Sequence, residues 1–226
     1  MKIKFFLSAV VLFSLVFING IVAQEEKADE SSNFSAGADF YSNYIWRGSK
    51  LATGPAFQPF VEFGTGGLTL GAWGSFDASG YTETDLYISY DFGFGLSLGV
   101  SDYYSPDLDV SDFSDSTGSH AYELNAAYEI QGLRLSANYI LNEAGNIGSA
   151  GSDLYFEAGY AFENFNIFVG AGDGWHTIEG DFNICNVGIG TEKEIRITDT
   201  FSIPVTGQVV FNPDRKSLFV VVGFSL

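Results

Sequence analysis

The chain has little cysteine, little basic charge and no helical periodicity, and these absences exclude several classes of protein. Its single cysteine, Cys185, allows no intramolecular disulfide, so a disulfide-stabilised scaffold is excluded. Ten Lys and Arg against 28 Asp and Glu give a formal net charge of −18, which makes nucleic acid an unsuitable partner. The sequence contains no CxxC, HExxH or phosphate-binding glycine loop, and although Ser119 precedes His120, no motif singles out a nucleophile. We therefore expect neither enzyme activity nor a cofactor.

The longest apolar run lies near the N-terminus, from Phe5 to Ile18, behind a basic start. A small residue, Ala23, follows it, and this layout is typical of a secretory signal peptide. The run is shorter than the about 20 apolar residues that a membrane-spanning helix needs. We predict a signal peptide over residues 1–23, then a short polar segment over 24–33.

From residue 34 to the C-terminus, apolar and polar residues alternate with a period of two. In one such stretch Leu86 and Ile88 alternate with Asp85, Tyr87 and Ser89, which places the two sets on opposite faces of a β-strand. The pattern predicts twelve strands and no helix after residue 33. The expected ranges are 34–46, 55–64, 67–77, 82–92, 95–104, 120–130, 132–142, 153–162, 164–172, 181–195, 199–212 and 216–226.

The connections between these strands alternate between tight glycine-containing turns and longer polar segments. Gly64–Gly67 and Gly93–Gly95 are short, whereas 105–119 and 143–152 are long. Such alternation is typical of an outer-membrane barrel, with short periplasmic turns and longer outer loops. We therefore predict an all-β fold: an antiparallel transmembrane β-barrel of about twelve strands over 34–226, in the outer membrane of a Gram-negative bacterium. A secreted β-sandwich remains the alternative, because it also shows alternation.

Three segments resemble a known family. "YSNYIWRGSKL" (41–51), "GAWGSFD" (71–77) and "DYYSPD" (102–107) occur in the order seen in exported bacterial proteins of the TorF-like porin family. Members often carry Ser-Asp where this chain has Ser42-Asn43. The resemblance implies a barrel and a transport role, and it implies no particular substrate. The alternating strand that ends at Leu226 also resembles the terminal strand by which the outer-membrane assembly machinery recognises barrels.

If the apolar face contacts lipid, the other face lines the barrel interior. That face is mostly acidic, which suits small polar or cationic solutes if the interior is open. The interior candidates are Arg47, Glu62, Trp73, Asp85, Tyr87, Asp91, Glu123, Glu129, Arg134 and Glu157. Two alternatives stay open: a water-filled pore, or a barrel closed by its own side chains that acts through its outer loops.

The segment around Arg47 combines aromatic rings with rare positive charge. Counting along a strand that runs to residue 46 places Tyr44 and Trp46 on the lipid face, as anchors at the membrane interface. The same count points Arg47 inward, where we expect it to pair with Asp85 or Glu123. The alternative is that Arg47 contacts anionic lipid headgroups from the first outer loop.

The loop over 105–119 is rich in carboxylates. Asp107, Asp109, Asp112 and Asp115 are weak candidates for Ca²⁺ ligands, because Ca²⁺ prefers oxygen. Leu108 interrupts their spacing, and the EF-hand pattern is absent. A solvated acidic loop is the simpler interpretation.

Overall fold

The computed structural model describes residues 33–226. The signal peptide expected over 1–23, and all but the last residue of the polar segment expected over 24–33, lie outside the described residues. Within 33–226 no helix is long and apolar enough to cross a membrane.

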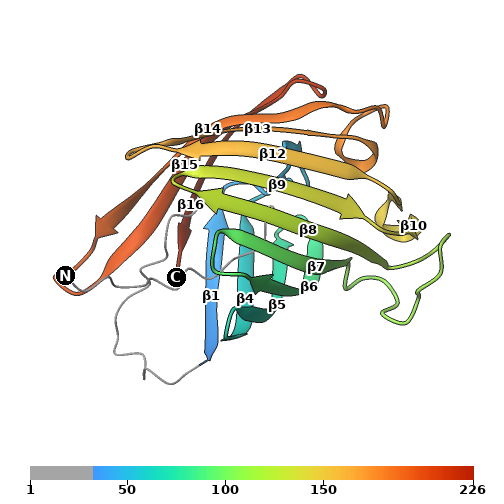
Figure 1. Ribbon diagram of the computed structural model, residues 1–226, viewed down its shortest axis with the longest axis horizontal. Helices are drawn as coiled ribbons and strands as arrows, with labels where there is room; N and C mark the ends of the chain where they lie inside the picture. Colours follow the sequence, from blue (N-terminus) through green and yellow to red (C-terminus); the bar gives the residue numbers. More distant parts are fainter. Residues whose placement is uncertain (1–32) are drawn as a thin grey trace.

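Twelve antiparallel strands form a closed barrel, as the alternation predicted (Figure 1). The first and last strands pair with each other, with Asp39 opposite Ser225, so no strand edge is left open. The barrel strands are β1 (Phe34–Tyr41), β4 (Ala56–Thr65), β5 (Leu68–Asp77), β6 (Thr82–Asp91), β7 (Leu96–Tyr104), β8 (His120–Ile130), β9 (Leu133–Ile140), β12 (Leu154–Ala161), β13 (Asn166–Gly172), β14 (Asn183–Arg196), β15 (Ser202–Asn212) and β16 (Ser217–Ser225).

The barrel wall is apolar outside and polar inside. On β6 the side chain of Leu86 is 56% exposed, whereas its neighbour Asp85 is 2% exposed. The same division holds on β9, where Leu135 faces outward and Asn138 is buried. A β-sandwich would bury the apolar face between its sheets, so the sandwich alternative is wrong.

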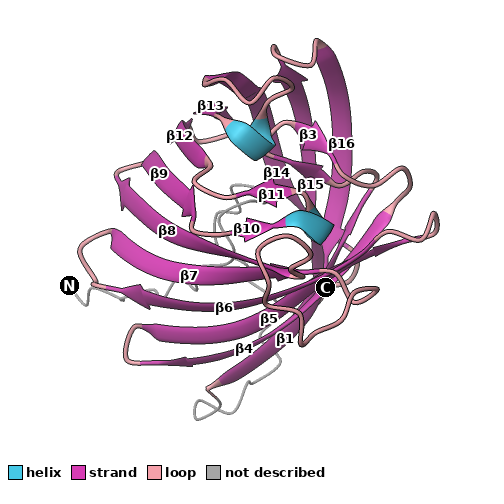
Figure 2. Ribbon diagram, turned by 90° about the vertical axis from the view of Figure 1, so that its right-hand side faces the viewer, coloured by secondary structure: helices cyan, strands magenta, loops and turns pink. Residues whose placement is uncertain are grey.

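Short turns join the strands at one end of the barrel, and longer connections join them at the other. These connections carry four two-residue strands and two 3₁₀ turns that the alternation did not predict. They are β2 (Ile45–Trp46), β3 (Ser49–Lys50), β10 (Glu143–Ala144), β11 (Ser149–Ala150), η1 (Gly145–Ile147) and η2 (Gly174–His176). Figure 2 shows β3, β10, β11 and both turns gathered at the barrel end that faces the viewer.

The first barrel strand ends at Tyr41, five residues before the predicted end. The chain then forms a hairpin, residues 42–55, in which Trp46 pairs with Ser49. Arg47 and Gly48 connect these two residues with φ of 48° and 80°. Positive φ at both central residues is the signature of a type I′ turn, which suits the twist of a hairpin. We call residues 42–55 the interior hairpin, because its side chains pack inside the barrel.

Aromatic side chains fill the barrel interior beside this hairpin. We call the buried group Tyr44, Trp46, Trp73, Tyr87 and Tyr103 the aromatic cluster. Partly buried side chains from four connections pack against it, namely Leu51, Tyr81, Ile147 and Trp175. The interior near the longer connections is therefore packed with rings.

Gly48 permits the close approach of the interior hairpin to β14. A Cβ at this position would lie 2.0 Å from the carbonyl oxygen of Cys185, and φ is left-handed.

We predict that Gly48→Ala lowers the free energy of unfolding by about 2 kcal/mol or more, measured by urea unfolding in detergent micelles. Gly66→Ala is the matched control, because Gly66 also has positive φ but has no atom within 4 Å of the added Cβ. It should cost about 1 kcal/mol or less, and equal losses in both variants would contradict the packing argument.

Candidate functional site

A buried ion pair connects the interior hairpin to β8. Arg47 donates from Nη1 to Glu123 Oε1 at 2.6 Å and from Nη2 to Oε2 at 2.8 Å. Arg47 is 4% exposed and Glu123 is fully buried. This two-point geometry is the strongest form of an Arg–carboxylate contact. The partner is one of the two acids, Asp85 and Glu123, that the sequence suggested for Arg47.

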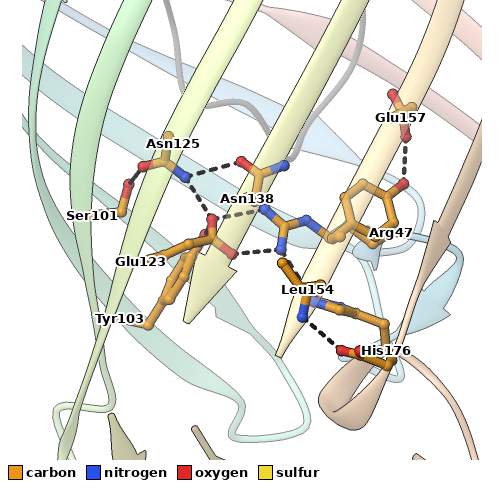
Figure 3. A network of polar contacts seen from close by, with 11 residues as sticks. Arg47, Ser101, Tyr103, Glu123, Asn125, Asn138, Leu154, Glu157 and His176 are labelled. Atoms are coloured by element: carbon orange, nitrogen blue, oxygen red, sulfur yellow. Dashed lines mark hydrogen bonds and ion pairs between the residues drawn. The ribbon is translucent and has the colours of Figure 1, made fainter. Parts of the chain in front are cut away.

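Neighbouring polar groups complete the hydrogen bonding of the Glu123 carboxylate (Figure 3). Its Oε2 accepts from the Tyr103 hydroxyl at 2.9 Å and from Asn125 Nδ2 at 2.6 Å. Asn125 also donates to Asn138 and accepts from the Ser101 hydroxyl. A buried charge is tolerated when it is paired and its remaining lone pairs are bonded, and this network meets both conditions.

Rings and a histidine surround the Arg47 guanidinium. Its Cζ lies 4.7 Å from the Trp46 ring centroid and 4.5 Å from that of Tyr155, which are cation–π distances. His176 Nε2 lies 3.4 Å from Nη1. Burial, and secondarily the positive charge of Arg47, lower the pKa of His176 to about 2. A neutral His176 therefore presents Nε2 to Arg47 as an acceptor.

The Tyr155 ring is itself held by further polar contacts. Its hydroxyl donates to Glu157, and Asn186 Nδ2 donates to both the Tyr155 oxygen and the Glu157 carboxylate. Arg47 thus lies over the face of the Tyr155 ring, and Glu157 lies at its hydroxyl.

Further hydrogen bonds hold the interior hairpin at three places. Asn212 Nδ2 donates to the Gly48 carbonyl at 3.0 Å, and Arg215 Nε donates to the Ser49 hydroxyl at 3.1 Å. The backbone N–H groups of Thr53 and Gly54 donate to Asp77. The hairpin leaves the wall between β1 and β4 yet contacts β5, β8 and β15, so it crosses the interior.

The other interior candidates lie apart from this network. Glu62 accepts from the Tyr87 hydroxyl, Trp73 belongs to the aromatic cluster, and Asp85 is buried beside it. Three candidates lie near the short turns instead: Asp91 accepts from the N–H of Gly93, and Arg134 pairs with Glu129 at 3.1 Å.

The prediction that Tyr44 and Trp46 face lipid is contradicted by their positions. Tyr44 is 1% exposed and Trp46 is 6% exposed. Tyr44 packs edge-on against Trp73 at 5.7 Å, and Trp46 packs against Tyr103 at 5.8 Å. The count along the strand was wrong because β1 ends at Tyr41 and the chain then turns inward.

Tyr103 and His176 contact the Arg47–Glu123 pair directly, and neither was a candidate from the sequence. Tyr103 could have been found, because it shares the inward parity of Ser101 on the same strand. His176 had no such signal, because it lies in η2, within a connection whose path only the folded chain defines.

The acidic loop over 105–119 forms local turns. Asp109 accepts from the N–H and hydroxyl of Ser111, and Asp112 accepts likewise from Ser114, which lowers the pKa of both carboxyls. Asp107 accepts from Thr82 instead. Within 33–226 no group of three or more His, Cys, Asp or Glu is arranged to hold a metal, so the structure does not bring Asp107, Asp109, Asp112 and Asp115 together as Ca²⁺ ligands.

His120, at the start of β8, contacts the neighbouring strand β7 and the acidic loop over 105–119. Its Nδ1 lies 2.9 Å from Asp102, and its Nε2 lies 3.0 Å from the Val110 carbonyl. Both ring nitrogens therefore contact these oxygens, and neither contacts a serine hydroxyl.

No family model and no curated protein sequence matches the chain, so the resemblance to the TorF-like family stays a prediction. Solved structures with a similar fold include engineered porins. A mutant of Rh. blastica porin aligns with a TM-score of 0.42 and 17% identity, over 76% of this chain and 55% of the porin. A triple mutant of Rhodopseudomonas blastica porin gives a TM-score of 0.40 and 15% identity over the same shares. The chain spans about half the length of the porins it matches.

Removing the charge of Arg47 alone should destabilise the barrel strongly. Arg47→Gln leaves Glu123 buried without its counter-charge, which we expect to lower the free energy of unfolding by about 3–5 kcal/mol. The double variant Arg47→Gln, Glu123→Gln should recover much of that loss, because no unpaired charge remains. Urea unfolding of both single variants and the double variant gives the coupling. Additive losses would contradict the pairing.

The low pKa of His176 predicts a pH dependence of stability. Unfolded histidine has a pKa of about 6.5, so below that pH the unfolded chain binds a proton that the folded chain excludes. The free energy of unfolding should therefore decrease as the pH falls below about 6.5, by up to about 1.4 kcal/mol per pH unit from this group. His176→Gln keeps an acceptor for Arg47 and should lack this component. Parallel pH profiles for the wild type and the variant would contradict the assignment.

Proposed function

We propose that the protein is an outer-membrane channel for small polar solutes that favours cations, and that the interior hairpin restricts its passage. The observation that carries this proposal is the interior hairpin, held across an acidic interior by the Arg47–Glu123 pair. The exposed apolar outer wall suits lipid. A location in the outer membrane after signal-peptide export is part of the proposal.

The charge of the interior supports a preference for cations. Arg47 is the only buried Lys or Arg among residues 33–226, and its charge is neutralised by Glu123. Glu62, Asp85 and Asp39 are also buried. Acidic side chains along a pore favour cations over anions.

Assembly in the membrane would use the last strand. On β16 the residues Leu218, Val220, Val222 and Phe224 all face outward, next to the β1–β16 closure. This exposed apolar series is the feature by which the assembly machinery would recognise the unfolded chain.

A second function is favoured by the aromatic cluster. Its rings are buried and fill the interior near the longer connections. A barrel closed in this way would be a structural or surface-binding protein that acts through its outer loops.

Conductance in planar bilayers separates the two functions. We expect the wild type to give small, discrete, cation-selective steps, and replacement of residues 43–54 by a short Gly-Ser linker to enlarge them. Replacement of 106–118, a loop of similar length outside the aromatic cluster, is the control and should leave conductance unchanged. The wild type and the variant with residues 43–54 replaced should both stay with outer membranes after a salt wash. Silent bilayers for the wild type and the hairpin variant would overturn the channel and favour the closed barrel.

A further inference from the structure

A second group of acidic side chains lies inside the barrel, apart from the Arg47–Glu123 pair. Glu83 and Asp85 are two residues apart on β6, so both face the interior about 7 Å apart along the strand. Asp85 is 2% exposed, and its Oδ1 is buried with no hydrogen-bond partner among residues 33–226. Because a buried carboxylate oxygen without a partner is unfavourable, this atom points to a ligand.

Aromatic rings surround the same two carboxylates. Trp73 lies directly opposite Asp85 in the β5–β6 register. Tyr44 packs 5.7 Å from Trp73 and 5.9 Å from Tyr81, measured between ring centroids. Tyr81 donates its hydroxyl to Glu83 at 2.9 Å. Aromatic faces and carboxylates both attract positive charge, so the group has the chemistry of a cation site.

The described part of the chain supplies no positive charge to these acids. Its ion pairs join Arg47 to Glu123, His120 to Asp102, Arg134 to Glu129 and Arg196 to Asp199. Glu83 already accepts from Tyr81, whereas Asp85 Oδ1 has no donor. A single positive charge beside Asp85 would complete the group.

The site lies near the barrel end that carries the longer connections. Asp77 organises the connection over 78–81, because its Oδ1 accepts from the N–H of Ser79 at 2.8 Å and of Tyr81 at 2.9 Å. Tyr81 belongs to this connection, is only partly buried, and donates its hydroxyl to Glu83. A small ion would therefore reach the carboxylates past the Tyr81 ring.

We propose that Asp85 and Glu83, with the rings of Tyr44, Trp73 and Tyr81, bind one small monovalent cation. The cation contacts Asp85 Oδ1 and is partly surrounded by the aromatic faces. No third carboxylate is arranged for a divalent metal, in keeping with the absence of a metal-holding group within 33–226. Binding does not require conduction, so the proposed cation site can be contradicted without contradicting the proposed channel function, and the reverse also holds.

Calorimetry on the full-length mature protein in detergent micelles tests the site. Methylammonium, K⁺ and Na⁺ chlorides are titrated separately at constant ionic strength, balanced with the chloride of the bulky cation N-methyl-D-glucamine. We expect saturable binding of at least one of these ions to the wild type. The affinity of Asp85→Asn for that ion should be lower by about tenfold or more, because the substitution removes a charged contact. Glu62→Gln removes another buried interior carboxylate outside the site and should bind as the wild type does.

A second measurement keeps the proposal testable if Asp85→Asn fails to fold. Binding to the folded state raises the Tm by mass action, so the bound ion should raise the Tm of the wild type and of Glu62→Gln, relative to N-methyl-D-glucamine. Absence of saturable heat and of a Tm rise for all three ions would overturn the site. Equal affinities in the wild type and in Asp85→Asn would overturn it as well.

Discussion

The barrel places its apolar side chains outside, so its interior must satisfy its own polar groups. This constraint explains why the alternating residues of each strand lie in such different environments on the two faces of the wall. Outside, Leu and Phe side chains need no partner. Inside, each carboxylate requires a donor or a counter-charge, and buried Lys and Arg are almost absent. Arg47 is therefore placed where one positive charge contacts the most deeply buried acid, Glu123.

The interior hairpin is the structural means of bringing that charge inward. A strand residue could reach only its neighbours on the wall, whereas a residue at a hairpin tip crosses the barrel. Arg47 occupies the tip with positive φ, which costs a non-glycine residue some backbone energy. The two-point ion pair, two ring contacts and His176 offset that cost. Stability of the barrel and restriction of its interior thus depend on the same few contacts.

Most of the wall was predictable from the sequence, because a period of two and glycine turns are local signals. The ends of β4, β5, β6 and β8 differ from their predictions by one residue at most. The interior hairpin was not predictable in the same way. Its residues continue the alternation of β1, and only the two-residue Arg47-Gly48 turn marks the change of direction. The parity count continued past Tyr41, where β1 ends, and therefore placed Tyr44 and Trp46 on the wrong face.

Cys185 lies under the tip of this hairpin, at the irregularity in the β13–β14 pairing, and its side chain is fully buried. Its carbonyl oxygen is the atom that excludes a side chain at position 48. Because the sequence has no other cysteine, any thiol modification of the protein occurs at Cys185, beneath the interior hairpin. The rate at which a water-soluble thiol reagent modifies the folded protein would therefore measure how often the hairpin leaves the interior, which is a kinetic property that no conductance record gives directly.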